Sequence, residues 1–117
     1  MDLDSAISKH AEWKLKFRTA ISKQEQMDAA TISKDNCCEL GKWLHGDAQA
    51  QLGHLPAHAD CIQKHAAFHA EAGKVAAAIN ARKYAEAEAM INAGTAYAQA
   101  SNTVGAAIVR LKKEAGL

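Results

Sequence analysis

Two histidines, His65 and His69, lie four residues apart in a stretch of the sequence with helical periodicity. Residues four apart sit one above the other on the same face of an α-helix. Their imidazole rings can therefore reach a common point and share a metal ion without bending the backbone. Phe68 lies beside them and is expected to wall that point off from water. The pair predicts a metal ion on the inner face of a helix, but a tetrahedral zinc site needs two more ligands.

The best further donors in the sequence are His10 and Cys38. His10 falls in the middle of an apolar stripe that repeats at helical spacing over residues 3–21. Cys38 falls in the first turn of a predicted helix, where free backbone N–H groups and the helix dipole favour a thiolate. Each residue also has an ordinary interpretation, His10 as a hydrogen-bonded core histidine and Cys38 as a small buried hydrophobe. For the neighbouring Cys37 we favour the buried hydrophobe.

A competing set of donors, His58, Cys61 and His65, also shares one face of the third predicted helix. A straight helix rises 1.5 Å per residue, so these groups spread over about 10 Å along its axis. They cannot all lie within about 2.3 Å of one ion, and we rank this set lower. His45 and His54 fall at or near helix ends and are expected to be solvated.

The periodicity predicts an all-α fold, a four-helix-type bundle with a short second helix, in one domain that spans residues 1–117. The last predicted helix carries a heptad-like seam, which suits packing inside the bundle or against a second subunit. We therefore expect a homodimer. The expected helices cover residues 2–26, 36–52, 56–81 and 84–114, with a loop at 27–35, and the seam is formed by Met90, Gly94, Tyr97, Ser101, Val104, Ile108 and Leu111.

Composition and charge argue against several classes of function. The net charge is +1 with acids and bases mixed along the chain, so no basic surface for nucleic acid or an anionic membrane is expected. No apolar run reaches the length of a membrane span and no signal peptide opens the chain, so we expect a cytoplasmic protein without membrane contact. The three cysteines then suggest reduced thiols or metal ligands.

The chain shows no pattern typical of an enzyme. It has no paired carboxylates, no Ser/His/Asp set and no Gly-rich phosphate loop. A site closed by four protein ligands would also leave no position for a metal-bound water nucleophile. We therefore expect no catalytic activity.

The order and spacing of three elements resemble the chemoreceptor zinc-binding (CZB) domain family. These elements are His10 with Trp13-Lys14, then Cys-Glu-Leu-Gly-Lys-Trp over residues 38–43, then His-Ala-Ala-Phe-His over residues 65–69. The resemblance covers about residues 3–112. It implies a four-helix-type bundle, usually dimeric, that binds one Zn²⁺ per chain through His10, Cys38, His65 and His69.

The resemblance also implies a function. Such domains are similar to regulatory modules of bacterial chemoreceptors and diguanylate cyclases, which sense zinc or oxidants and control an output domain. No output domain is recognisable within these 117 residues, so the chain is a stand-alone member or a part of a larger signalling protein. Two alternatives remain open from the sequence: a di-iron or haem-binding bundle, and a purely structural adaptor bundle. A di-iron bundle needs several inward Glu or Asp residues, which the predicted inner faces lack.

Overall fold

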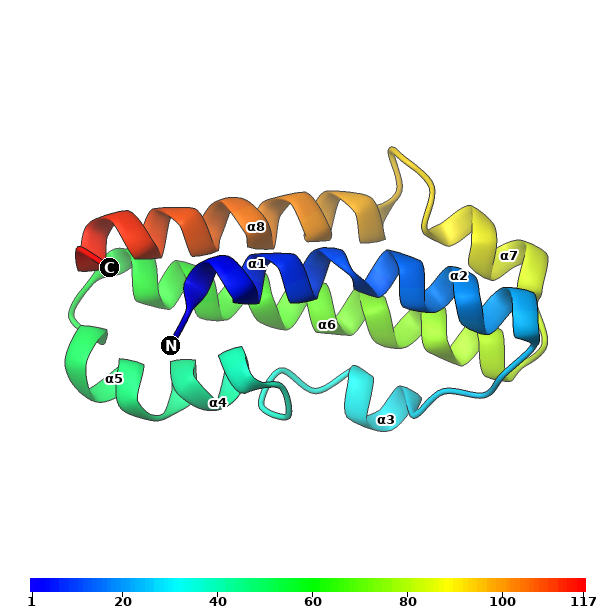
Figure 1. The fold of residues 1–117 in the computed structure, drawn as a ribbon, viewed down its shortest axis with the longest axis horizontal. Coiled ribbons are helices and arrows are strands. Elements are labelled where there is room, and N and C mark those ends of the chain that lie inside the picture. The colour runs from blue at the N-terminus through cyan, green and yellow to red at the C-terminus, as the bar shows by residue number, and fades with distance from the viewer.

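A computed structural model describes all 117 residues of the chain and contains helices but no strands. The confirmed all-α architecture is a bundle of four columns, three of which are made of more than one helix (Figure 1). No helix has both the length and the apolar character needed to cross a membrane. The helices are α1 (Leu3–Ala11), α2 (Trp13–Lys23), α3 (Ala29–Ile32), α4 (Glu39–His45), α5 (Asp47–Leu52), α6 (Pro56–Asn80), α7 (Tyr84–Met90) and α8 (Ala96–Ala115).

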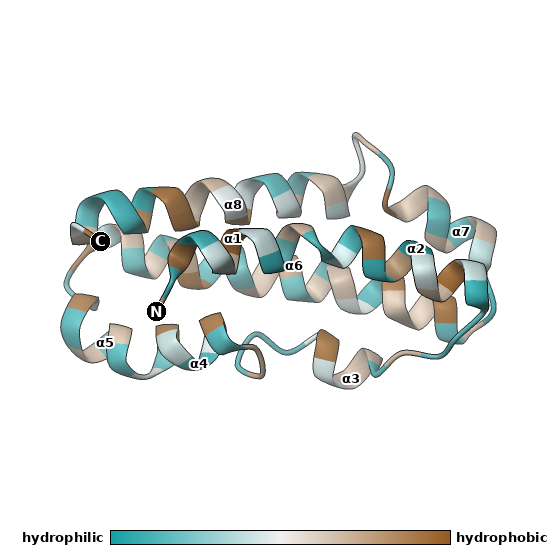
Figure 2. Cartoon of the chain, in the orientation of Figure 1, coloured by the Kyte–Doolittle hydropathy of each residue, from teal (hydrophilic) through white to brown (hydrophobic).

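Helix α6 is the centre of the bundle and contacts α2, α3, α4, α5, α7 and α8. It begins with Pro56, whose fixed φ and missing N–H suit the first turn of a helix. Its buried face carries His65 and His69, as predicted from their spacing, and also includes His58, Cys61 and Phe68. Apolar and polar residues alternate along the long helices, as expected when one face of each is buried (Figure 2). The two histidines of the central pair are therefore held in the most enclosed part of the fold.

The first predicted helix is shorter than expected and is interrupted once. It ends at Lys23, because Gln24 takes a left-handed backbone conformation with φ 55°. The interruption at Glu12 separates α1 from α2, which follow one another along the same side of the bundle (Figure 1). The predicted stripe is retained, with Leu3, His10 and Phe17 all buried.

The second column of the bundle, which consists of α3, α4 and α5, differs most from the prediction. The expected loop contains the single helical turn α3, which Asp28 caps by accepting a hydrogen bond from the Thr31 N–H at 3.2 Å. The expected helix over residues 36–52 is split at Gly46 into α4 and α5. The column packs on α6, and Ser33 approaches α6 so closely that a Cβ atom at Gly73 would collide with it. A glycine on α6 therefore lets the segment between α3 and α4 lie against the central helix.

The prediction of one continuous last helix is wrong. The chain leaves the helix after Met90 and starts α8 at Ala96, with Gly94 at a φ of 83° and Thr95 as the N-cap. The Thr95 hydroxyl accepts a hydrogen bond from the Ala98 N–H at 3.2 Å. In α8 the predicted seam residues Tyr97, Val104, Ile108 and Leu111 are buried within the chain itself. The seam is therefore occupied by internal packing and gives no support to a subunit contact.

Candidate metal centre

Three separate parts of the chain bring four donor atoms together. His10 comes from the last turn of α1, Cys38 precedes the first turn of α4, and His65 and His69 come from the middle of α6. One donor atom from each of these residues lies within 4.8 Å of all the others. All four candidate residues from the sequence therefore converge at one point of the fold.

The separations between the donor atoms suit one small cation. The Nε2 atom of His65 lies 3.1 Å from that of His10 and 3.0 Å from that of His69. The Cys38 sulfur lies 3.2, 3.6 and 3.8 Å from the Nε2 atoms of His65, His69 and His10. A tetrahedral Zn²⁺ with bonds of about 2.0–2.1 Å to nitrogen and about 2.3 Å to sulfur separates its ligands by about 3.3–3.6 Å. The five separations given above, 3.0 to 3.8 Å, are close to these dimensions.

Hydrogen bonds at the far side of two rings fix which nitrogen faces the centre. The Nδ1 atom of His10 donates to the Ala6 carbonyl oxygen at 2.7 Å, and that of His69 donates to the Ile32 carbonyl oxygen at 2.8 Å. A carbonyl can only accept, so both rings carry their proton on Nδ1 when neutral. Their Nε2 lone pairs then point at the centre, the orientation that a metal ion requires.

His65 makes the need for a cation clearer still. Its ring is fully buried between His10 and His69, and its Nδ1 atom has no hydrogen-bond partner. With its proton on Nε2 it can donate to only one of the two facing lone pairs, and with its proton on Nδ1 three lone pairs face one another. A cation at the centre would be bound by all three Nε2 lone pairs at once, which neither position of the proton allows, whereas the Nδ1 atom of His65 stays without a partner in every case. The donor set itself, three imidazoles and a thiol, suits zinc.

Burial controls the protonation of the cluster. Desolvation is the main cause that lowers the pKa of His10 and of His69, and it lowers the pKa of His65 to about 3. Mutual repulsion among the charged forms of the histidines contributes to the shifts of His10 and His65. The three rings are therefore neutral near pH 7, which is the protonation state of an imidazole that binds a metal ion.

Cys38 differs from the sequence-based expectation in its protonation. It is the N-cap of α4, and its sulfur accepts a hydrogen bond from the Gly41 N–H at 3.4 Å. However, burial raises the pKa of the Cys38 thiol by more than the backbone N–H groups lower it. Without a metal ion the sulfur is therefore a thiol rather than the thiolate that the helix N-terminus was expected to favour. Binding of a metal ion by Cys38 would require loss of this proton, which the charge of the ion would favour.

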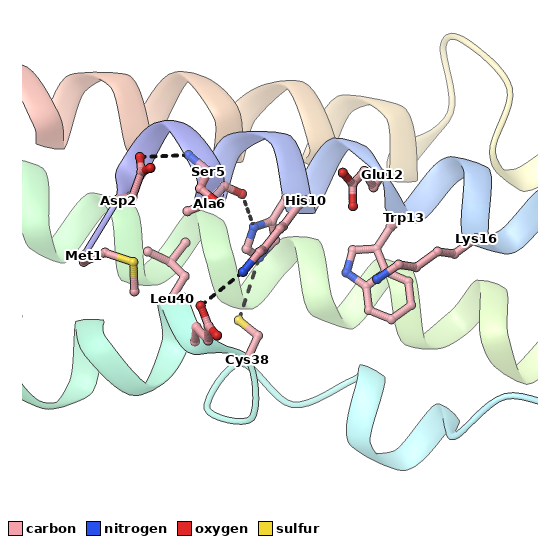
Figure 3. A pocket seen from close by; sticks show the side chains of 12 residues that line it. Met1, Asp2, Ser5, Ala6, His10, Glu12, Trp13, Lys16, Cys38 and Leu40 are labelled. Atoms are coloured by element: carbon pink, nitrogen blue, oxygen red, sulfur yellow. Dashed lines mark hydrogen bonds and ion pairs between the residues drawn. The ribbon is translucent and has the colours of Figure 1, made fainter.

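One face of the cluster borders a cleft of about 290 Å³ (Figure 3). His10 and Cys38 both line this cleft, which lies between α1 and the start of α4. Cys38 is half-buried, whereas His65 and His69 are at most 2% exposed. The sulfur is consequently the donor of the cluster that is most open to small solutes.

The competing donor set is not assembled. The His58 Nε2 atom donates to the Leu44 carbonyl oxygen at 2.9 Å, so this histidine has an ordinary role that joins α6 to α4. Cys61 is buried in the apolar core, and burial raises the pKa of its thiol to about 12. His54 is exposed, as expected. Cys37 is also exposed, so our interpretation of it as a buried hydrophobe is wrong.

The lowered histidine pKa values predict that the metal-free protein becomes less stable in mild acid. Histidines of the unfolded chain take up protons below about pH 6.5. In the fold, the pKa of His65 is lowered to about 3, so this ring stays neutral in mild acid. The unfolded state then binds more protons, so the free energy of unfolding falls as the pH falls, by up to about 1.4 kcal/mol per pH unit for each such histidine.

Urea unfolding of chelator-treated protein between about pH 7 and pH 5 measures this effect. His65→Gln should reduce it. Equal stability of the wild type at both pH values would contradict the assigned protonation states.

The fold and the cluster together define a helical bundle with one cluster of three histidines and one cysteine that could hold a metal ion. The family model described as the chemoreceptor zinc-binding domain matches residues 10–76, which is more than half of the chain. The chain belongs to this family, and its cofactor is zinc. No curated protein and no solved structure matches the chain.

Proposed function

We propose that the protein is a zinc-dependent sensory domain of bacterial signalling, with one Zn²⁺ per chain bound by His10, Cys38, His65 and His69. Membership of a family of zinc-binding signalling domains supports the general function. The main support for this ligand set is geometric: one donor atom from each of the four residues lies within 4.8 Å of the other three. Four protein ligands would complete the tetrahedron, which argues against hydrolysis at the metal.

The di-iron alternative has no support at this centre, because the cluster contains no carboxylate. A purely structural role would not explain why the Nε2 atoms of His10 and His69 both face that of His65 at about 3 Å. We therefore retain the sensory proposal alone. Its output is proposed to be control of chemotaxis or of cyclic-di-GMP synthesis, exerted in the cytoplasm on an attached or associated signalling protein. The homodimer rests on the family resemblance, and light scattering measures it directly.

Cys38 is proposed to be the residue that makes the centre responsive. It is the only thiol in the cluster and borders the cleft beside α1. A zinc-bound thiolate reacts with hypochlorous acid to give a sulfenic acid and chloride, so that sulfur is oxidised and chlorine is reduced. The neutral product is a poorer zinc ligand. A change in free zinc would shift the same equilibrium by mass action, without oxidation.

Loss of the ion is expected to act mainly on the second column of the bundle. Cys38 is the only proposed ligand in α3–α5, whereas α6 and α8 pack extensively on each other. Hydrogen exchange should therefore rise over residues 27–45 when zinc is removed or when hypochlorous acid is added, and should change little in α6 and α8.

Three cysteine variants test whether Cys38 is the thiol that responds to the oxidant. Cys37→Ser and Cys61→Ser should still respond to the oxidant, whereas Cys38→Ser should already exchange rapidly at residues 27–45 and change no further. A uniform rise in exchange across all helices would mean that zinc only stabilises the fold, and the local switch would have to be abandoned.

A further inference from the structure

We propose that Asp35 and His45 form an outer clamp of the metal centre, which holds the segment bearing Cys38 on α4 and supplies a negative charge that balances the bound cation. The inference rests on the proposed zinc ligation. Asp35 lies three residues before Cys38, and its Oδ2 atom lies 2.9 Å from the His45 Nε2 atom. His45 is in the last turn of α4, so the pair ties the segment before the helix to its far end.

The backbone of Asp35 is held at the other end of α4. A Cβ atom at Gly41 would collide with the Asp35 carbonyl oxygen, so the chain before Cys38 lies directly on the first turn of the helix. Asp35 consequently meets α4 at two points, by the close approach of its carbonyl to Gly41 and by the hydrogen bond of its carboxylate to His45. The position of the Cys38 sulfur depends on this short segment, because both ends of the segment are fixed.

The proposed centre needs one more negative charge to be neutral. Zn²⁺ with one thiolate and three neutral imidazoles has a net charge of +1. The Asp35 side chain is 28% exposed, whereas that of Glu39, the residue next to Cys38, is 77% exposed and is paired with Lys9 at 3.2 Å. Water and Lys9 screen the charge of Glu39 far more than that of Asp35. Asp35 is thus the better placed of these two carboxylates to balance the ion.

The electrostatics of the metal-free protein agree with this position. Burial acts to raise the pKa of Asp35, but its hydrogen bond from His45 and the nearby histidines lower it overall, so the carboxyl is ionised near pH 7. Its negative charge adds to the rise in the pKa of Cys38 and opposes the larger effect of burial that lowers the pKa of His65 and His69. The field of Asp35 therefore reaches three of the four donors. Because its Oδ2 atom is bonded to His45, we assign Asp35 a positioning and charge-balancing role rather than ligation.

Zinc affinity of five variants, measured by chelator competition on the full chain with Zn²⁺ as the probe, separates charge from anchoring. Asp35→Asn keeps the shape and an acceptor for His45 but removes the charge, and should weaken binding about tenfold, as loss of an outer partner of a metal site does. Asp35→Glu should restore most of the affinity. His45→Gln, which can still donate to Asp35, should match the wild type, and His45→Ala should weaken binding about threefold. Asp47→Asn on α5 removes an exposed carboxylate and should have no effect.

The salt dependence of zinc affinity distinguishes a charge-balancing role of Asp35 from a merely structural one. The difference in zinc affinity between the wild type and Asp35→Asn should become smaller as salt is raised from about 0.02 M to about 0.5 M, because salt screens a partly exposed charge. Binding by Asp35→Asn within twofold of the wild type would overturn the proposal. Equal, salt-independent losses in Asp35→Asn and His45→Ala would overturn the charge-balancing role. A wild type that binds no zinc would instead remove the proposed function on which this inference rests.

Discussion

Replacing His69 by alanine is expected to weaken zinc binding by about 10²–10³-fold. Structural zinc sites bind with about 10–16 kcal/mol, so one ligand of four represents about 2.5–4 kcal/mol, and each factor of ten in affinity is about 1.4 kcal/mol. The Nε2 atom of His69 lies within 3.6 Å of the Cys38 sulfur and 3.0 Å from the His65 Nε2 atom, so no other side chain can replace it without rearrangement. Competition with a chelator of known affinity measures the loss.

His58 and Cys61 provide matched controls for this prediction, since both are buried on the same helix but lie outside the cluster. His58→Ala removes the hydrogen bond to the Leu44 carbonyl oxygen and should lower the stability of the fold, with little effect on zinc affinity. Cys61→Ser should likewise retain zinc. If these two variants lose zinc while His10→Ala retains it, the assigned ligand set is wrong.

Replacing Gly41 by alanine is expected to weaken zinc binding by at least about tenfold and to destabilise the metal-free protein by about 1–3 kcal/mol. A Cβ atom here would collide with the backbone carbonyl of Asp35, and backbone cannot move aside as a flexible side chain can. Relief of the collision must displace the segment that leads into Cys38. The sulfur would then leave the position in which it faces three imidazoles.

Gly105 in α8 is the control for Gly41, because no atom lies within 4 Å of a Cβ built there. Gly105→Ala should stabilise the protein by about 0.5–1 kcal/mol through helix propensity and leave zinc affinity unchanged. Urea unfolding and chelator competition on both variants test the pair. If Gly41→Ala binds zinc like the wild type, the close contact with Asp35 does not position Cys38.

The sequence predicts most of the centre because each of its parts leaves a local signal. The spacing of His65 and His69 and the apolar stripe around them place both rings on the buried face of α6, and the structure agrees. The stripe around His10 shows that it is buried, but a core histidine would give the same pattern. The resemblance to the family, rather than periodicity, links His10 and Cys38 to the pair on α6.

Features that depend on contacts between distant residues could not be predicted in this way. The Ile32 carbonyl that orients His69 belongs to α3, a single turn inside a stretch that was expected to be a loop. The break before α8 depends on the positive φ of Gly94 and on the Thr95 cap, whereas the heptad-like spacing continues through both residues. The raised pKa of Cys38 follows from its burial in the tertiary fold, which outweighs the local effect of the helix N-terminus.

X-ray absorption at the zinc edge of the zinc-loaded protein tests the central claim most directly. The four assigned ligands predict one sulfur at about 2.3 Å and three nitrogens at about 2.0–2.1 Å from each ion, with one ion per chain. Cys38→Ser should lose the sulfur contribution, whereas Cys37→Ser and Cys61→Ser should keep it. A wild-type spectrum with no sulfur or with two sulfurs, or a sulfur contribution that persists in Cys38→Ser, would contradict a centre built from His10, Cys38, His65 and His69.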